Sequence, residues 1–187
     1  MNLYLFGGSF DPPHLGHKEI IKHFIGKSDL FVVSPAFKSP FKDSSPHVSF
    51  LHREKMLKLM LDSDIIHNMI IIDYECINKS PYTVDTVKYL QKRYLDCKIH
   101  MIIGADQFNM LESWKDHQYI SENVTINVVS RPGDMIKNSC IKYDLTDTIS
   151  IDVSSSYIRD NISRSRKISK VLDERVLEYI LNNKLYS

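Results

Sequence analysis

The feature that most constrains the fold is a series of short, uninterrupted apolar segments separated by longer stretches with helical periodicity. Strands that are apolar along their whole length are typical of a sheet that is buried on both faces. Six segments are predicted to be strands: Leu3–Phe6, Leu30–Val33, Met69–Tyr74, Ile99–Ile103, Val124–Val129 and Ile149–Val153. Helices are predicted between and after them, at Leu15–Ile25, Phe50–Leu61, Thr83–Tyr94, from Gln107–Leu111 onward and at about Asp173–Leu181.

This alternation of strands and helices indicates the fold class. A strand, a helix and a parallel strand are almost always joined by a right-handed crossover, so the pattern predicts an α/β fold. We expect a Rossmann-like, doubly wound parallel sheet of five to six strands, with a small helical C-terminal part at about residues 155–187. Residues 1–187 suit a single domain, because they contain neither an internal repeat nor a linker. In such sheets, ligands bind at the carboxyl ends of the strands.

Composition and charge argue against several classes of function. The formal net charge of +1 does not indicate a general nucleic-acid surface. No apolar stretch reaches the roughly 18 residues of a membrane span, and the N-terminus does not resemble a signal peptide. The cysteines Cys76, Cys97 and Cys140 are odd in number and far apart, which favours a reducing compartment over a disulfide framework. We therefore expect a soluble, cytoplasmic protein without nucleic-acid or membrane partners, and the sequence leaves a homo-oligomer open.

The first group of candidate functional residues follows the first predicted strand and runs from Gly7 to His17, with the sequence GGSFDPPHLGH. The glycine pair Gly7-Gly8 allows a tight turn and a close approach of ligand atoms, although such a pair is often only a turn. His14 and His17 are three residues apart on the first helical turn, so their donors suit a bound phosphate. Taken alone, the two histidines could instead bind a metal or lie on a solvated face.

A second group follows the last predicted strand and consists of Ser154, Ser155, Ser156 and Arg159. Serines in front of a helical pattern are common N-cap residues, which is a purely structural explanation for them. Arg159 lies one turn into that helix, where its guanidinium can reach an anion bound at the start of the helix. The two groups together predict a phosphate-binding site, and the sequence contains no carboxylate cluster that predicts a metal site.

Both groups resemble motifs of the HxGH nucleotidyltransferase superfamily. Residues 7–17 are similar to its GGxFDPxHxGH motif, and residues 153–159 (VSSSYIR) are similar to its ISSTxIR motif. The resemblance implies that His14 and His17 contact the triphosphate of ATP and stabilise the pentacoordinate phosphorus. It implies further ATP contacts by Gly7, Gly8, Ser9, Phe10, Ser155, Ser156 and Arg159.

The loop after the second predicted strand, residues 35–46, is rich in proline, serine and lysine. Its segment Pro40-Phe41-Lys42 is similar to a PxxxPPHK-like segment of the family, with Phe41 where histidine is common. The resemblance assigns Lys42 to the catalytic group and to the acceptor site. Lys38 is a second candidate for a phosphate contact.

The middle of the chain resembles one branch of this superfamily, the bacterial nicotinate mononucleotide adenylyltransferases. Residues 80–87 (SPYTVDTV) are similar to its SYTVDTL segment, and residues 103–106 (IGAD), followed by Trp114-Lys115, are similar to its GAD…W pattern. The resemblance implies that Tyr82 and Trp114 hold a flat pyridine ring and that N–H groups around Tyr82 and Thr83 hold its carboxylate. Trp114 alone could instead anchor the core. Pro81 stands where the family has serine and removes one backbone N–H.

Three more residues are assigned to ATP by the same resemblance. Gly104 and Asp106 belong to the GAD pattern, and Arg131 belongs to a segment that matches the family's RPG. Asp106 could accept hydrogen bonds from ribose hydroxyls, cap a helix, or do both. Arg131 could lie over the adenine or form an ion pair. The C-terminal Leu185-Tyr186 matches the closing LY of the family.

The implied reaction is adenylyl transfer from ATP to nicotinate mononucleotide, which gives nicotinate adenine dinucleotide and pyrophosphate in NAD biosynthesis. His14, His17, Lys42 and Arg159 would be the catalytic residues, with Mg²⁺ held mainly by the ATP phosphates. Three alternatives stay open: nicotinamide mononucleotide or phosphopantetheine as the acceptor, a fragment of a class I aminoacyl-tRNA synthetase, and a nucleotide-binding regulator without catalysis. The SPYTVDT and GAD…W segments argue against phosphopantetheine, and the lack of a KMSKS-like segment argues against a synthetase.

Overall fold

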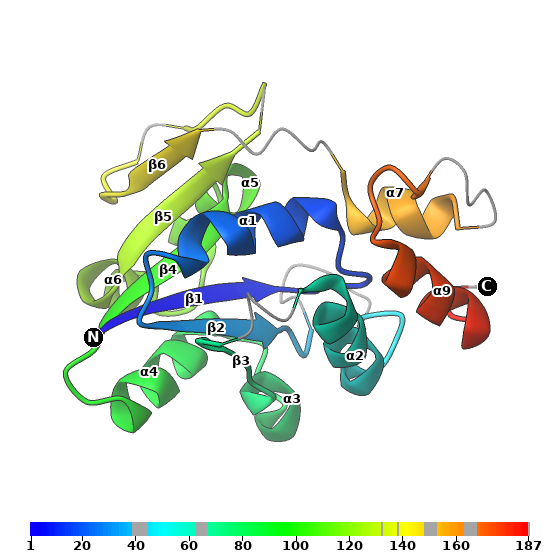
Figure 1. Ribbon diagram of the computed structural model, residues 1–187. Coiled ribbons are helices and arrows are strands. Elements are labelled where there is room, and N and C mark those ends of the chain that lie inside the picture. Colours follow the sequence, from blue (N-terminus) through cyan, green and yellow to red (C-terminus); the bar gives the residue numbers. More distant parts are fainter. Residues whose placement is uncertain are drawn as a thin grey trace.

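A six-stranded parallel sheet forms the centre of the molecule (Figure 1). The computed structural model describes residues 1–38, 45–62, 67–131, 133–137, 139–147, 153–162 and 168–186. The strands follow the order β3-β2-β1-β4-β5-β6, and every adjacent pair is parallel. Their bounds are β1 Asn2–Gly8, β2 Leu30–Pro35, β3 Met69–Ile71, β4 Lys98–Gly104, β5 Thr125–Ser130 and β6 Asp144–Asp147. The predicted Rossmann-like α/β fold is confirmed.

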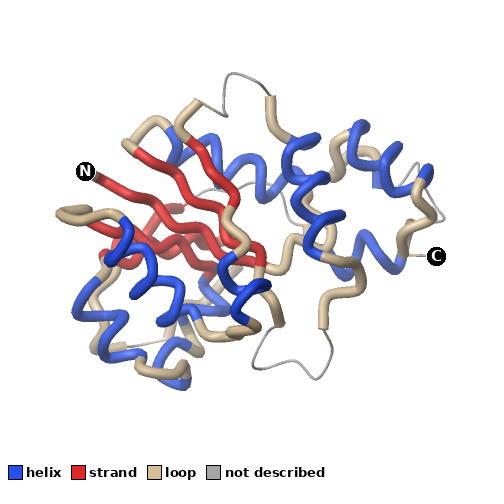
Figure 2. The backbone as a smooth tube through the Cα atoms, turned by 90° about the horizontal axis from the view of Figure 1, so that it is seen from below, coloured by secondary structure: helices blue, strands red, loops and turns tan. Residues whose placement is uncertain are grey.

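Helices cover both faces of the sheet and continue beyond its carboxyl edge. Helix α1 lies on one face and α3 and α4 lie on the other, while α2, α7 and α9 gather past the strand ends (Figures 1 and 2). The bounds are α1 Leu15–Ile25, α2 Phe50–Met60, α3 Tyr74–Asn78, α4 Thr83–Arg93, α5 Ala105–Phe108, the 3₁₀ helix η2 Leu111–Ser113, α6 His117–Asn123, α7 Ser155–Asp160 and α9 Glu174–Asn182. The last helix agrees with the prediction at Asp173–Leu181 to within a residue at each end.

Two predicted strands are placed differently by the structure. The sixth strand was predicted at Ile149–Val153, but β6 is the polar segment Asp144–Asp147, which pairs with β5. Residues 148–152 lie outside the described residues, and Val153 is buried without being in a strand. A strand at the edge of a sheet needs no apolar run, so a search for such runs missed it. The third strand ends at Ile71, and Tyr74 already begins α3.

The core consists of a layer of side chains on each face of the sheet. Along β1, Leu3 and Leu5 pack with α4 residues on one face, whereas Tyr4 and Phe6 pack on the other, where α1 contributes to the core. The same alternation in β4 and β5 gives a further cluster beneath α5 and α6. Because both faces are covered, successive residues of a central strand are all buried, as the apolar runs predict. No helix within the described residues is both long and apolar enough to cross a membrane.

Leu90 of α4 tests the contribution of this packing to stability. Its side chain is fully buried against Leu3 and Leu5. The substitution Leu90→Ala should lower the free energy of unfolding by about 3 kcal/mol, because it leaves a cavity under the central strands. Leu95→Ala is the matched control, since Leu95 is 79% exposed, and should change stability by less than about 0.5 kcal/mol. Urea denaturation followed by circular dichroism measures both, and equal losses in the two variants would contradict the assigned packing.

Candidate active site

Two adjoining cavities open at the carboxyl ends of β1 and β4. We call the cavity of about 400 Å³ that is lined by the His14–His17 turn the first cavity, and the cavity of about 550 Å³ that is lined by Tyr82 and Trp114 the second cavity. Both are lined by a shared strip of residues, which consists of Gly7, Gly8, Ser9, Ile103, Asp106 and Gln107. The two cavities are therefore neighbouring compartments of one site, located where the strand order reverses.

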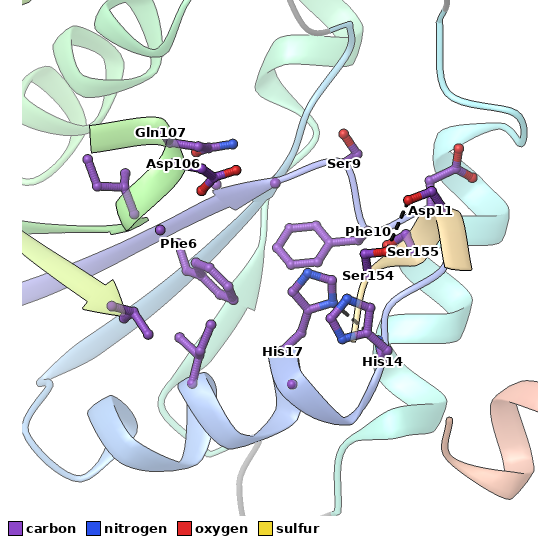
Figure 3. Close-up of a pocket in the computed structure, with 18 of the residues that line it drawn as sticks. Phe6, Ser9, Phe10, Asp11, His14, His17, Asp106, Gln107, Ser154 and Ser155 are labelled. Carbon is purple, nitrogen blue, oxygen red and sulfur yellow. Dashed lines mark hydrogen bonds between the residues drawn. The ribbon is translucent and has the colours of Figure 1, made fainter. Parts of the chain in front are cut away.

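The rings of His14 and His17 are stacked on each other at the start of α1 (Figure 3). Their ring centroids are 3.7 Å apart and the rings are inclined by 22°. The backbone N–H of His14 donates to Nδ1 of His17 at 3.2 Å. Because Nδ1 accepts, a neutral His17 carries its proton on Nε2, which is then the donor available to a ligand. The ring of Phe10 meets His17 edge-on, with centroids 4.9 Å apart, and restricts its orientation.

Both histidines are neutral at pH 7. Burial lowers the pKa of His14 to about 3, and the positive charge of Arg131 acts in the same direction. The pKa of His17 also lies well below its usual value, chiefly because of burial and further because of His14 and Arg131. The effect of Arg131 on both rings means that its charge lies near the first cavity, which it also lines. The turn therefore offers neutral hydrogen-bond donors beside an arginine.

The backbone around the histidines is shaped for close packing. Phe10 is buried and adopts a left-handed conformation with φ of 49°, which is uncommon for a bulky residue and turns the chain sharply after Ser9. A side chain at Gly16 would come within 3.1 Å of the His14 ring and 3.4 Å of Val153. At Gly104 a Cβ would lie 2.6 Å from the Asp106 carboxylate. Glycine at both positions lets the walls of the cavity approach each other.

The carboxylate of Asp11 connects three distant segments of the chain. It is buried and accepts hydrogen bonds from the backbone N–H of His47 at 2.7 Å and from the Tyr186 hydroxyl at 2.8 Å. The His47 ring also lies 3.1 Å from it through Nδ1. Burial and the neighbouring Asp11 carboxylate raise the pKa of Tyr186, which keeps its hydroxyl protonated as a donor. Asp11 thus fixes the loop before α2 and the C-terminal tail against the first motif.

The second motif is hydrogen-bonded to the first one. Ser154 caps α7 by accepting the N–H of Tyr157 at 3.2 Å, so the structural explanation for one serine is confirmed. Ser155 donates from Oγ to the carbonyl of Pro12 at 2.8 Å, and Arg159 donates from one terminal nitrogen to the carbonyl of Asp11 at 2.6 Å. These residues, with Ser156, line the first cavity. The bonds place α7 beside His14, although the two motifs lie at opposite ends of the sequence.

The second cavity has aromatic and apolar walls. Tyr82 is partly exposed and Trp114 is half-buried, and Met110 and Pro81 complete that side. Thr83 is the first residue of α4, so its backbone N–H has no partner within the helix. The backbone N–H of Tyr82 donates to Ser80 Oγ at 3.4 Å.

Glu75 and Arg53 support the floor of the site. The buried Glu75 carboxylate accepts hydrogen bonds from Thr86, Phe37 and Ser34, at 3.2, 3.3 and 3.4 Å. Burial raises the pKa of Glu75, and these donors together with Arg53 oppose the rise. The guanidinium of Arg53 donates to the carbonyl of Ser9 at 2.7 Å, so α2 holds the loop that separates the two cavities.

The structure brings together nearly all the residues that were predicted for the site. The first cavity is lined by Gly7, Gly8, Ser9, Phe10, His14, His17, Gly104, Asp106, Arg131, Ser155, Ser156 and Arg159, and the second by Tyr82, Thr83, Trp114 and Lys38. Lys42 lies outside the described residues. Sequence reasoning missed Asp11, His47, Arg53, Glu75, Gln107 and Tyr186. The only signals in the sequence were the place of Asp11 inside the first motif and of Tyr186 in the closing LY.

Comparisons with known proteins agree on one family. A family model described as Cytidylyltransferase-like matches residues 5–161. Two proteins named "Probable nicotinate-nucleotide adenylyltransferase", from Borrelia garinii subsp. bavariensis and Borreliella burgdorferi, are each 34% identical to this chain over 189 residues. The alignments cover 100% of this chain and 95% and 97% of the two relatives.

Solved structures show the same fold. Nicotinic acid mononucleotide adenylyltransferase from Plasmodium falciparum, complexed with NaAD, matches with a TM-score of 0.86 at 21% identity, over 99% of this chain and 97% of that chain. The same Plasmodium falciparum enzyme complexed with APC matches with a TM-score of 0.83 at 21% identity, over 99% and 96%. With the family model and the two relatives, the chain belongs to the cytidylyltransferase-like family and, within it, to the nicotinate-nucleotide adenylyltransferases.

Proposed function

We propose that this protein transfers the adenylyl group of ATP to nicotinate mononucleotide, forming nicotinate adenine dinucleotide and pyrophosphate in NAD biosynthesis. The observation that carries the proposal is the pairing of two cavities across the strip of residues that they share. One cavity presents donors and positive charge suited to phosphates, and the other presents aromatic walls suited to a flat ring. The names of the relatives at 34% identity support the same reaction.

In this proposal, the first cavity binds ATP. The Nε2–H of His17 and the His14 ring act on the triphosphate, at the helix start where an anion is favoured. Arg131 and Arg159 add positive charge, and Ser9, Ser155 and Ser156 add hydroxyl groups. Asp106 and Gly104 lie at the end of β4, where the ribose and adenine would bind. Gln107 lines both cavities and joins this group.

The proposed reaction needs no nucleophile from the protein. A phosphate oxygen of the acceptor attacks the α-phosphorus of ATP in line, and the bond from this phosphorus to the bridging oxygen breaks as pyrophosphate leaves. Negative charge builds up on the oxygens around phosphorus, and donors fixed in advance stabilise it. His14 and His17 are held by stacking and by the bond to Nδ1, so little reorganisation is required when the charge develops.

The second cavity takes the acceptor in this proposal. Tyr82 and Trp114 contact the pyridine ring, and the unpaired N–H of Thr83 faces its carboxylate. Lys38 and Lys42, on the loop after β2, are the cations proposed for the acceptor phosphate. The strip that the cavities share would then be the place where the two phosphates meet.

Mg²⁺ is the proposed cofactor, carried mainly by the ATP phosphates and water. Among the described residues, no set of three or more His, Cys, Asp or Glu side chains is arranged to hold a metal ion. The carboxylates that line the first cavity are Asp11, Asp106 and Asp134. Asp11 and Asp134 already accept hydrogen bonds from the protein, so Asp106 is the side chain suited to a water-mediated contact. The bound ion would neutralise charge on the phosphates.

We place the enzyme in the cytoplasm as one domain spanning residues 1–187. All three cysteines are free thiols, which supports a reducing compartment. The hydrogen bonds from Ser155, Arg159 and Tyr186 to residues 11 and 12 support treating the C-terminal helices as part of the same unit.

The choice of acceptor is tested by pyrophosphate release from Mg²⁺-ATP. Nicotinate mononucleotide should give rapid release, and phosphopantetheine should give none, because the second cavity is built for a flat ring. Nicotinamide mononucleotide is the close comparison, since it differs only in the ring substituent. ATP binding without release from any acceptor would contradict the proposed enzyme and favour a nucleotide-binding regulator.

The role of His17 is tested by substitution. His17→Ala should lower kcat by about 100-fold while KM for ATP changes far less, because the donor acts mainly on charge that develops in the transition state. His23→Ala provides the matched control, since His23 is exposed at the far end of the same helix. Steady-state kinetics give kcat and KM for ATP of both variants. An unchanged kcat in His17→Ala would overturn the mechanism.

The neutral state of His14 has a measurable effect on stability. Because its pKa is about 3 in the folded protein and about 6.5 when unfolded, only the unfolded chain takes up this proton as the pH falls below 6.5. The free energy of unfolding should therefore drop by about 2 kcal/mol more in the parent than in His14→Gln between pH 7 and pH 5. Urea denaturation at several pH values measures this difference. If the free energy of unfolding falls by the same amount in both proteins, His14 takes up its proton in the folded protein as well, and the assigned neutral state is wrong.

A further inference from the structure

We propose that the ammonium group of Lys115 selects a carboxylate over an amide on the ring of the acceptor. The inference rests on the proposed function, because it takes the second cavity as the acceptor site. It assigns a specificity role to a side chain that the family motifs do not include. Nicotinate and nicotinamide mononucleotides have nearly the same shape, so a protein can separate them only by charge and by hydrogen bonding.

Lys115 is placed at the two aromatic residues of the second cavity. It directly follows Trp114 in the sequence, and both residues line the cavity. Its Nζ lies over the Tyr82 ring, 4.4 Å from the ring centroid. Cation–π attraction to this ring holds the ammonium beside the position proposed for the pyridine. A substituent of a ring between Tyr82 and Trp114 is therefore within reach of a positive charge.

The protein holds Lys115 in place without neutralising it by a direct hydrogen bond. Among the described residues it pairs with Oδ1 of Asp85, which is 3.9 Å away and therefore beyond hydrogen-bond distance. The other oxygen of Asp85 accepts a hydrogen bond from Ser80 at 2.6 Å, which fixes this carboxylate at the start of α4. Asp85 thus orients the lysine side chain and leaves its donors available to a ligand.

Backbone donors at this position are fewer than the motif suggests. Pro81 has no N–H, and the N–H of Tyr82 is directed to Ser80 Oγ at 3.4 Å. The N–H groups of Thr83 and Val84 are the donors at the start of α4 that the helix itself leaves unpaired. A carboxylate at the N-terminus of α4 would have these neutral backbone donors, and the ammonium of Lys115 supplies a further donor with a full charge.

The other charged residues around the second cavity are less suited to this role. Glu75 is a buried carboxylate that already accepts three hydrogen bonds, and Asp106 carries the wrong sign. Lys38 belongs to the loop after β2, whose Phe37 N–H is held by Glu75, on the side of the proposed acceptor phosphate. In the part of the chain that the structure describes, Lys115 is the cation that contacts an aromatic ring of this cavity.

Lys115→Met and Lys115→Arg test the inference by equilibrium binding. Trp114 is the only tryptophan of the chain, so its fluorescence reports occupation of this cavity. Dissociation constants for nicotinate and nicotinamide mononucleotides are measured with the ATP site filled by a non-hydrolysable analogue. The parent protein should bind the acid more tightly, and Lys115→Met should reduce that preference by about tenfold, as expected for the loss of one hydrogen bond to a charged group. Lys115→Arg should retain the preference.

Lys88→Met is the matched control. Lys88 lies 4.7 Å from the Tyr119 ring centroid and 3.3 Å from Asp116, and its side chain is 46% exposed, compared with 45% for Lys115. It makes the same kinds of contact outside the second cavity, so its loss should leave the preference for the acid intact.

The outcomes separate this inference from the proposed function. An acid preference that is unchanged in Lys115→Met, or equal binding of both nucleotides by the parent, overturns the role of Lys115 even if pyrophosphate is released. A Lys115-dependent preference without any pyrophosphate release supports the role of Lys115 and overturns the enzyme. A parent that binds neither nucleotide overturns both.

Discussion

The common direction of the six strands is the constraint on which the site depends. Because all strands are parallel, their carboxyl ends share one edge of the sheet. The chain leaves β1 toward α1 on one face and leaves β4 toward α5 and α6 on the other, so a crevice opens between these two strands. The turn after Gly8 and the turn after Gly104 border this crevice from neighbouring strands. Both cavities follow from that geometry before any particular side chain is considered.

Within the crevice, the protein combines neutral donors with fixed positive charge. A buried pair of protonated histidines would be costly in the absence of a ligand, whereas neutral rings can be stacked and held in place. Burial is the main reason that the pKa values of both rings are low, nearby Arg131 acts in the same direction, and Arg131 adds the charge that an incoming phosphate requires. The free protein thereby avoids repulsion among buried charges and remains electrostatically suited to a polyanion. Catalysis of the proposed kind uses this preorganisation and no covalent chemistry of the protein.

The sequence predicts the parts of this site that are local and misses those that are distant. The turn from Gly7 to His17 is contiguous, so its spacing already indicates a helix start with donors for an anion. The partners of Asp11 lie 36 and 175 residues away, and no pattern of residue types connects them. Apolar runs locate the four inner strands because those strands are covered on both faces, and they also locate the edge strand β3, which happens to be apolar. A search for apolar runs does not find the polar edge strand β6, because a strand at the edge of a sheet has less need of apolar side chains.

The hydrogen bond between Tyr186 and Asp11 ties the catalytic turn to the docking of the C-terminal tail. Contacts between residues so far apart in sequence close a very large loop, and such contacts tend to form late in folding. Segments outside a central sheet can also open locally while the sheet stays intact. On heating, the C-terminal tail would then detach from Asp11, and enzymatic activity would be lost, at a temperature below that at which the sheet unfolds. Residual activity in a stored or mutated sample would report whether this tail is still bound to the first motif. Circular dichroism would report only the secondary structure that remains.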